Sequence, residues 1–357
     1  MTMARRGMLL GAGAMVAMPR AALAATIAER LKQAEASGKV SGLHALLISK
    51  AGKTVFEHYG RGVDEKWGAP LGTVTFGPKV LHDLRSVSKS VIGLVYGIAL
   101  ADKKVPPPDA GLYEQFPEYA DLARQPGRDK LTLANVLSMT MGLEWDELTY
   151  PYGDPRNSEN AMVAAPDRYR FVLERPIVGE PGDKWTYCGG ATALLGRLIA
   201  RGTGQPLLAY ARQVLFEPLG FGASDMIMGK DGEPQAASGL RLLPPDLLKI
   251  GQLILGRGKW GDRQVVPLDW LKESFTPRIV LPDGVRYGYQ WYLGQMKVGE
   301  KPEPWLRGIG WGGQNLFIFP TFDAVVAINC GNYRKPGKEQ SQIVNAIMTE
   351  VVTPALI

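Results

Sequence analysis

The sequence predicts an α/β (α+β) protein in which one antiparallel sheet is built from both ends of the chain. β-rich runs lie near both ends, and helical periodicity dominates the middle. The length of 357 residues, of which 45% are hydrophobic, exceeds what one small core needs. We therefore expect a sheet domain from residues 25–85 and 280–357, flanked by helices, and a mainly helical inserted domain at 86–279.

The expected elements follow in order along the chain. Helical spacing over 25–38 ends at a glycine, and two β-rich runs, 43–49 and 53–60, meet at a KAGK turn typical of a hairpin. Residues 86–101 predict a buried helix because their apolar face is broad. Further helices are expected at 131–139, 191–202, 206–220, 244–258 and 267–275, strands at 288–296, 315–320 and 324–330, and a closing helix at 339–356.

The first 24 residues have the pattern of a signal peptide, with a basic start, an apolar stretch and an Ala-x-Ala site. Arg5 and Arg6 resemble a twin-arginine export signal. A buried or anchoring helix is the alternative, but the apolar run of about 12 residues is short for one. We expect cleavage after Ala24 and a periplasmic or secreted mature protein. No integral membrane span is expected there, because no apolar run of 18 residues follows position 25.

The charge balance argues against a nucleic-acid partner. The formal net charge is +6, from 41 basic and 35 acidic residues, and three of the basic residues lie in the first 24 positions. The remaining excess is small and scattered, which does not make a nucleic-acid surface. Two cysteines, Cys188 and Cys330, are too few for a disulfide framework and are expected to be small buried hydrophobes.

Missing motifs exclude several catalytic classes. The three histidines, His44, His58 and His82, form no HExxH or HxH pair, so a zinc hydrolase is not expected. There is no GxSxG, and no histidine follows residue 82, which excludes the α/β-hydrolase order. Residues 308–313 fit GxGxxG, but a strand follows where a dinucleotide loop needs a helix. We expect no metal and no organic cofactor.

Ser86 and Lys89 form an SxxK at the start of the predicted buried helix, and no other serine has a lysine three positions later. At this spacing the hydroxyl and the amine lie on the same helix face. Burial disfavours the charged amine, so that it can accept the serine proton. A helix N-cap and a solvated lysine are the ordinary alternatives for these two residues.

Two further clusters accompany the SxxK in order. Tyr187 lies in WTYCGG (185–190) before a predicted helix, and Trp311 lies in GWGGQ (310–314) at the head of a predicted strand. With the SxxK they resemble the motifs of the penicillin-recognising serine hydrolases. That family includes class C β-lactamases, D-Ala-D-Ala peptidases, β-lactamase-like esterases and 6-aminohexanoate-oligomer hydrolases. The resemblance covers most of the mature chain and implies a β-lactamase/transpeptidase-like fold.

The resemblance also implies roles for individual residues. Ser86 would be the acylated nucleophile, Lys89 its proton acceptor, and Tyr187 a second acid/base whose phenolate Lys89 favours. The oxyanion hole would be formed by the backbone N–H groups of Ser86 and Gln314. The residues expected to line the substrate site are Trp311, Gly312, Gly313, Gly189, Trp145 and Tyr150. Core packing is the alternative for Tyr187 and Trp311, and a surface loop is the alternative around Tyr150.

Two departures from the family pattern narrow the expected substrate. Gly189 stands where the family has an asparagine that binds a substrate amide, and Trp311 replaces the lysine or histidine that binds a substrate carboxylate. Both changes disfavour penicillins and D-Ala-D-Ala peptides and favour a neutral substrate in the esterase and oligoamide-hydrolase branch. We therefore expect an exported serine hydrolase that cleaves a carboxylic ester or a small linear amide.

Three alternatives stay open at this point. A 6-aminohexanoate-type amidase and a D-Ala-D-Ala peptidase or β-lactamase use the same nucleophile. A binding or sensor protein that is acylated without turnover belongs to another class, and the missing asparagine at position 189 is compatible with it. The expected partner in each case is a small molecule with an ester or amide bond.

Overall fold

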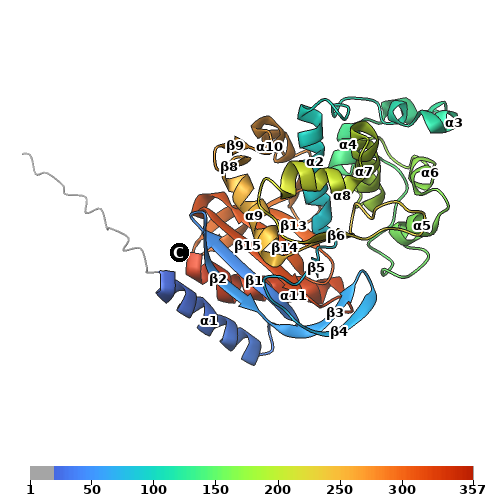
Figure 1. The fold of residues 1–357 in the computed structure, drawn as a ribbon. Helices are drawn as coiled ribbons and strands as arrows, with labels where there is room; N and C mark the ends of the chain where they lie inside the picture. The colour runs from blue at the N-terminus through green and yellow to red at the C-terminus, as the bar shows by residue number, and fades with distance from the viewer. Residues whose placement is uncertain (1–19, 357) are drawn as a thin grey trace, which may run out of the picture.

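The computed structural model describes residues 20–356, and its central element is an eight-stranded antiparallel sheet (Figure 1). Strand β1 pairs with β15, so segments from the two ends of the chain lie side by side, as the sequence predicts. In spatial order the strands are β10 (Ile279–Val280), β11 (Arg286–Tyr287), β12 (Tyr292–Val298), β13 (Lys301–Gly310), β14 (Gln314–Phe319), β15 (Ala324–Cys330), β1 (Leu43–Lys50) and β2 (Lys53–Tyr59).

Both faces of this sheet are covered, which explains the continuous apolar runs in its central strands. Along β1, Ala45 and Leu47 join the core on one face, whereas Leu46 and Ile48 join the core on the other. This alternation is the period of two expected of a strand. One face packs against α1 (Arg20–Ala36), α11 (Gly337–Ala346) and α12 (Thr353–Leu356), and the other against α2 (Val87–Ala101) and α9 (Pro244–Leu255) (Figure 1).

The middle of the chain is mainly helical, as expected. Helix α7 packs against α2 and α4, which places the start of α2 between the helices and the sheet. Helix α9 also comes from this middle segment, yet it packs on β15, β1 and β14 of the sheet. The other helices here are α3 (Ala120–Ala123), α4 (Leu133–Ser138), α5 (Ser158–Ala164), α6 (Arg168–Leu173), α7 (Gly189–Thr203), α8 (Leu207–Ala211) and α10 (Leu268–Ser274).

Several strands were not expected from the sequence. Strand β13 contains Pro302 and Pro304, which argue against a strand. They are tolerated because this half of β13 pairs only with β12, and pairing with β14 begins at Leu306. The other unexpected strands are short or exposed: β10 and β11 of the main sheet, β3 (Arg61–Lys66), β4 (Ala69–Thr75), β5 (His82–Asp83), β6 (Ser224–Met226), β7 (Leu240–Leu242), β8 (Lys259–Trp260) and β9 (Arg263–Gln264).

The predicted signal peptide lies almost entirely outside the described residues. Helix α1 begins at Arg20, so the predicted cleavage point after Ala24 falls within its first turns. Across residues 20–356, no helix has the length and apolar character needed to cross a membrane.

A glycine allows α9 to lie close to the sheet. A Cβ added at Gly251 would lie 2.3 Å from Cγ1 of Val325 on β15, which is far inside van der Waals contact. Because Val325 is fully buried and branched at Cβ, it has little freedom to move. The position of α9 on the sheet therefore depends on the missing side chain.

We expect Gly251→Ala to lower the free energy of unfolding by about 1–3 kcal/mol, although alanine is the better helix former. The additional change Val325→Ala should make the Gly251 substitution less costly, because it removes the clashing methyl groups. Chemical denaturation of the two single variants and the double variant measures this coupling. Gly77→Ala is the control, since nothing lies within 4 Å of a Cβ there. Additive losses would contradict the close approach.

Candidate active site

Ser86 and Lys89 lie together at the start of α2, as the SxxK spacing predicts. Ser86 is the N-cap of the helix and is 8% exposed, whereas Lys89 is 2% exposed. The amine Nζ of Lys89 donates to Oγ of Ser86 over 3.0 Å and to the carbonyl oxygen of Ala237 over 3.2 Å. The pair has the geometry of a nucleophile with an adjacent base.

Tyr187 completes this group from the segment before α7. Its ring lies 4.7 Å from Nζ of Lys89, and its hydroxyl hydrogen-bonds with Ser86. Burial and the negative charge of Glu147 raise the pKa of Tyr187 well above its usual value, and the bond with Ser86 only partly opposes this. The prediction that Lys89 favours a phenolate at Tyr187 is therefore wrong for the free protein, in which Tyr187 is a neutral phenol.

Two buried carboxyl groups, on Glu147 and Glu159, lie behind Tyr187. Oε2 of Glu147 accepts the indole N–H of Trp145 over 2.9 Å and the backbone N–H of Gly189 over 2.6 Å, and Oε1 accepts the hydroxyl of Tyr152 over 3.1 Å. Burial, and then the charge of Glu159, raise the pKa of Glu147 to about 8. Glu147 is therefore mostly protonated at neutral pH.

These carboxyl groups also explain the glycine at position 189. A Cβ there would lie 3.1 Å from an oxygen of Glu159 and 3.2 Å from an oxygen of Glu147. Any side chain at position 189 would have to displace these carboxyl groups by a few tenths of an ångström, so the pair disfavours the asparagine of the family pattern. The sequence did not reveal the pair, because nothing in an acidic residue's local pattern shows that it will be buried.

Ser86 lies where two hollows meet, and both are lined by Ser86, Tyr152 and Trp311. The larger hollow, of about 740 Å³, extends from Ser86 toward the β3–β4 hairpin and the segment before α11. The smaller one, of about 180 Å³, extends toward β12 and β13. Two hollows on either side of a nucleophile provide separate places for the acyl part and the leaving group of a substrate.

The structure brings some of the expected substrate residues to these hollows and not others. Trp311 lines both hollows, and Gly313 lines the smaller one. Trp145 and Gly189 lie behind the site as hydrogen-bond donors to Glu147. Tyr150 lines neither hollow and packs under Arg156, whereas Tyr152, which was not selected, lines both.

Glycine is needed at position 312 in the turn after β13. Its φ is +86°, and a Cβ there would lie 2.4 Å from the ring of Tyr333. Its backbone N–H donates to Oε1 of Gln340. Gly312 therefore shapes the turn that carries Trp311, and it lines neither hollow.

Gln314 lies away from the hollows, contrary to its expected place in the oxyanion hole. It is fully buried, and its side-chain amide bonds with the carbonyl oxygens of Trp311 and Cys330. The residue beside Ser86 at the end of β13 is Trp311. Within residues 20–356, no acceptor is found for the backbone N–H groups of Ser86 and Trp311.

Cations reach the site from positions other than 311. Arg85, Arg334 and Lys335 line the larger hollow, and Arg307 lines the smaller one. Arg307 donates to Oδ1 of Asn315 and has no carboxylate partner among the described residues; burial lowers its pKa to about 10. Trp311 supplies no cation for a substrate carboxylate, but these four residues bring positive charge to the hollows from other positions.

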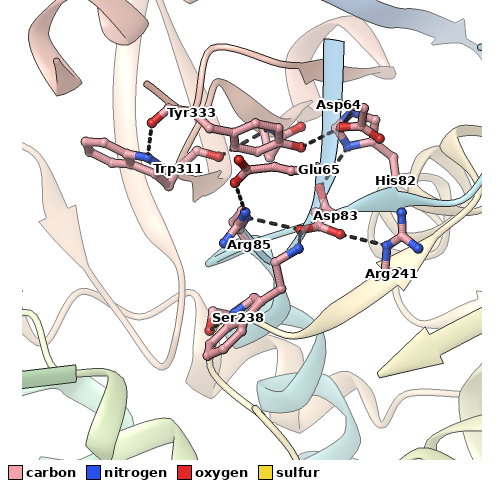
Figure 2. A network of polar contacts seen from close by, with 12 residues as sticks. Asp64, Glu65, His82, Asp83, Arg85, Ser238, Arg241, Trp311 and Tyr333 are labelled. Atoms are coloured by element: carbon pink, nitrogen blue, oxygen red, sulfur yellow. Dashed lines mark hydrogen bonds and ion pairs between the residues drawn. The ribbon is translucent and has the colours of Figure 1, made fainter. Parts of the chain in front are cut away.

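The wall of the larger hollow is tied together by polar contacts (Figure 2). Arg85, with φ of +48°, lies between the carboxylates of Glu65 and Asp83 and over the ring of Tyr333. The carbonyl oxygen of Tyr333 accepts the indole N–H of Trp311 over 2.7 Å. Strained backbone at a non-glycine residue costs about 1–3 kcal/mol, and here it lies directly before the nucleophile.

Among the described residues, no cluster of three or more metal-ligand side chains includes a residue at Ser86, although the carboxyl group of Glu159 lines the larger hollow. The single cluster with that composition joins His44, Asp64 and His82 behind Tyr333. The chemistry available at Ser86 itself is thus nucleophilic attack by a hydroxyl with an amine base and a phenol nearby.

A serine and a lysine at the start of a helix beside an antiparallel sheet, with a tyrosine from the segment before α7 next to them, form the arrangement of a lysine-assisted serine hydrolase. The chain belongs to the Beta-lactamase family, whose model matches residues 23–342. The fold is therefore the β-lactamase/transpeptidase-like fold expected from the motifs.

Individual relatives agree with this assignment. The chain is 25% identical to the 6-aminohexanoate-dimer hydrolase of Paenarthrobacter ureafaciens over 325 residues, which are 84% of this chain and 75% of that protein. The structure is similar to EstCE1, a hydrolase with promiscuous acyltransferase activity, with a TM-score of 0.68 and 18% identity over 92% of this chain and 97% of that one. It is also similar to a class C β-lactamase, with a TM-score of 0.66 and 15% identity over 94% and 98%.

The raised pKa of Glu147 predicts a pH-dependent effect on stability. The unfolded chain loses this proton near pH 4.5, whereas the folded chain keeps it until about pH 8. Between these values the folded state binds the extra proton, so rising pH removes stability. Glu147→Gln keeps the shape of the protonated acid but cannot lose a proton, so its stability should not fall as pH rises. We therefore expect the Tm of Glu147→Gln minus the Tm of wild type to increase by about 2 °C or more from pH 5 to pH 9.

Thermal unfolding followed by circular dichroism at several pH values measures this difference. Glu144→Gln, at an exposed neighbouring position, is the control and should show no trend with pH. A difference between Glu147→Gln and wild type that stays constant with pH would mean that Glu147 is ionised in the folded protein throughout.

Proposed function

We propose that this chain hydrolyses a carboxylic ester or a small linear amide through an acyl-enzyme on Ser86. The observation that carries the proposal is the contact between Nζ of Lys89 and Oγ of Ser86, with the neutral phenol of Tyr187 beside both. In acylation, Lys89 takes the proton of Ser86 and Tyr187 gives its proton to the leaving group. This leaves an ammonium next to a phenolate, and each stabilises the other.

Deacylation reverses these proton transfers. The phenolate of Tyr187 takes a proton from the attacking water, and the ammonium of Lys89 returns a proton to Oγ of Ser86. The negative oxygen of each tetrahedral intermediate would be bound by the free backbone N–H groups of Ser86 and Trp311. A protonated Glu147 fits this cycle, because an ionised carboxylate there would oppose the phenolate.

A carboxylate on the substrate is favoured by Arg307. A half-buried cation without an acidic partner among the described residues, in a hollow that Ser86 also lines, is best satisfied by an anionic group. A linear amide with a free carboxyl end fits this requirement and agrees with the name of the 25% identical relative. An ester with a carboxylate on its acyl chain fits it equally well.

Ser86→Ala should abolish ester turnover and covalent labelling by a fluorophosphonate probe, since it removes the hydroxyl that contacts Nζ of Lys89. Wild-type burst kinetics with p-nitrophenyl esters separate an enzyme from an acylated sensor, which would release one equivalent of product and stop. Nitrocefin, assayed alongside, tests the β-lactamase alternative. Full activity in Ser86→Ala would end the proposal.

Lys89 and Tyr187 should behave as one proton-transfer unit, so their losses should not multiply. The values of kcat/KM for Lys89→Ala, Tyr187→Phe and the double variant test this. We expect the double variant to be close to the worse single variant. A loss equal to the product of the single losses would show two independent groups and contradict the relay.

Arg307→Met should lower kcat/KM for mono-p-nitrophenyl glutarate by about 10-fold or more, because one charge-assisted contact of about 1.5–3 kcal/mol is lost. The neutral p-nitrophenyl pentanoate has the same acyl length without the carboxylate and should change little. Arg307→Lys is the matched control that keeps the charge. Equal losses for the two esters would assign Arg307 a packing role alone.

We also propose that the protein is exported, on the basis of the signal-peptide pattern ending at Ala24. Expression of the full chain in a bacterial host should then yield a mature periplasmic form that begins at Ala25. Mass spectrometry of the purified protein measures its N-terminus. Replacing Arg5 and Arg6 by lysines should leave precursor in the cytoplasm if the route depends on the arginine pair.

A further inference from the structure

Three buried side chains behind the wall of the larger hollow bring their polar atoms within 4.8 Å of one another; Figure 2 labels two of them, Asp64 and His82. His44 on β1, Asp64 on β3 and His82 on β5 are each at most 2% exposed. Nδ1 of His44 lies 2.9 Å from Nε2 of His82, and Oδ1 of Asp64 lies 3.9 Å and 3.8 Å from these two nitrogens. Three strands thus bring two nitrogens and one oxygen to a single point.

The other nitrogen of each imidazole is engaged with the backbone. Nδ1 of His82 donates to the carbonyl oxygen of Asp83 over 2.9 Å. His44 donates a hydrogen bond to the backbone of Val63. The donor is Nε2, because this nitrogen and the Val63 carbonyl oxygen lie on the same side of the ring: a Cβ added at Gly331 would lie 2.4 Å from the nitrogen and 2.7 Å from the oxygen. Each ring therefore carries its proton on the nitrogen that faces away from the other ring.

The two nitrogens that face each other are then left with lone pairs. Two lone pairs at 2.9 Å repel unless a cation lies between them. In addition, Oδ2 of Asp64 is buried without a hydrogen-bond partner among residues 20–356. A buried carboxylate oxygen without a hydrogen-bond partner is costly and also calls for a cation.

The geometry favours a metal ion over a shared proton. A proton between the two rings would leave Oδ1 of Asp64 beyond hydrogen-bond distance of both nitrogens. A point in the plane of the three atoms, by contrast, lies about 2.1 Å from each of them, which matches Zn–N and Zn–O bond lengths. Histidine ligands that donate their second N–H to a backbone carbonyl are also typical of metal sites.

We propose that His44, Asp64 and His82 bind one divalent transition-metal ion, with zinc as the best match to two imidazoles and one carboxylate. The ion would be structural and enter during folding, because the ligands are inaccessible in the folded chain. It would hold the wall of the larger hollow: Oδ1 of Asp64 accepts the hydroxyl of Tyr333 over 3.3 Å, and Tyr333 in turn accepts the indole of Trp311. The site does not depend on the proposed substrate.

Metal analysis of the full chain tests the proposal. The protein is unfolded with guanidinium and EDTA, refolded with or without zinc, desalted and measured by inductively coupled plasma mass spectrometry. We expect about one zinc per chain and a higher Tm for the zinc-loaded form, because a ligand of the native state alone stabilises it. Refolding with Co²⁺ should give visible absorption bands of a nitrogen- and oxygen-ligated ion.

Asp64→Asn and His44→Gln should lose the bound metal. His58→Gln is the matched control, since His58 is the third histidine of the chain and lies on β2 outside the cluster. If the cluster variants fail to fold, the Co²⁺ spectrum of the wild type still decides. Less than about 0.1 equivalent of metal in refolded wild type would overturn the proposal in favour of a hydrogen-bonded histidine pair, and so would equal metal content in Asp64→Asn and His58→Gln.

Discussion

The burial of α2 is the constraint on which the rest of the structure depends. From Val87 to Ala99 every residue of this helix is buried, because it packs against the sheet on one side and against α7 and α10 on the others. A helix enclosed in this way has one fixed rotation, so Ser86 and Lys89 are held at the junction of the sheet and the helical segment. The nucleophile is therefore positioned by the core and not by a mobile loop.

This position has an electrostatic consequence for the groups around Ser86. Lys89, Glu147 and Glu159 are almost inaccessible to water, so each charge acts strongly on its neighbours. The carboxyl group of Glu147 remains protonated near neutral pH and Tyr187 remains a neutral phenol. The free site thus avoids adjacent negative charges, and in the proposed mechanism a phenolate would form only beside a protonated Lys89.

The wall opposite the helices is built differently, from polar contacts between strands that are distant in sequence. Trp311 is held by Tyr333, Tyr333 contacts Asp64, and Arg85 is held by Glu65 and Asp83 (Figure 2). A cation bound between His44, His82 and Asp64 would neutralise the far end of this network. The substrate cavity and the proposed metal site would then be two sides of one wall.

Much of the fold follows from local pattern. The hairpin of β1 and β2, the buried helix α2, the strands β14 and β15 and the closing helix all lie where the apolar periodicity predicts them. Strand β13 was missed because Pro302 and Pro304 signal against a strand, and only the staggered pairing with β12 and β14 makes room for them. The turn between β13 and β14 explains why Gln314 was wrongly expected in the oxyanion hole, since the end of a strand cannot be located to one residue from sequence.

The sequence by itself determined the chemistry of the nucleophile, because Ser86 and Lys89 are three residues apart and the helix alone brings them together. Tertiary structure alone decided what surrounds them. Glu147 reaches Gly189 across 42 positions, and His44 meets His82 across 38. A short-range pattern cannot contain such contacts, because burial and charge at a site depend on every segment packed there. The protonation states of these groups, and the charges that line the site, are therefore decided by the folded chain.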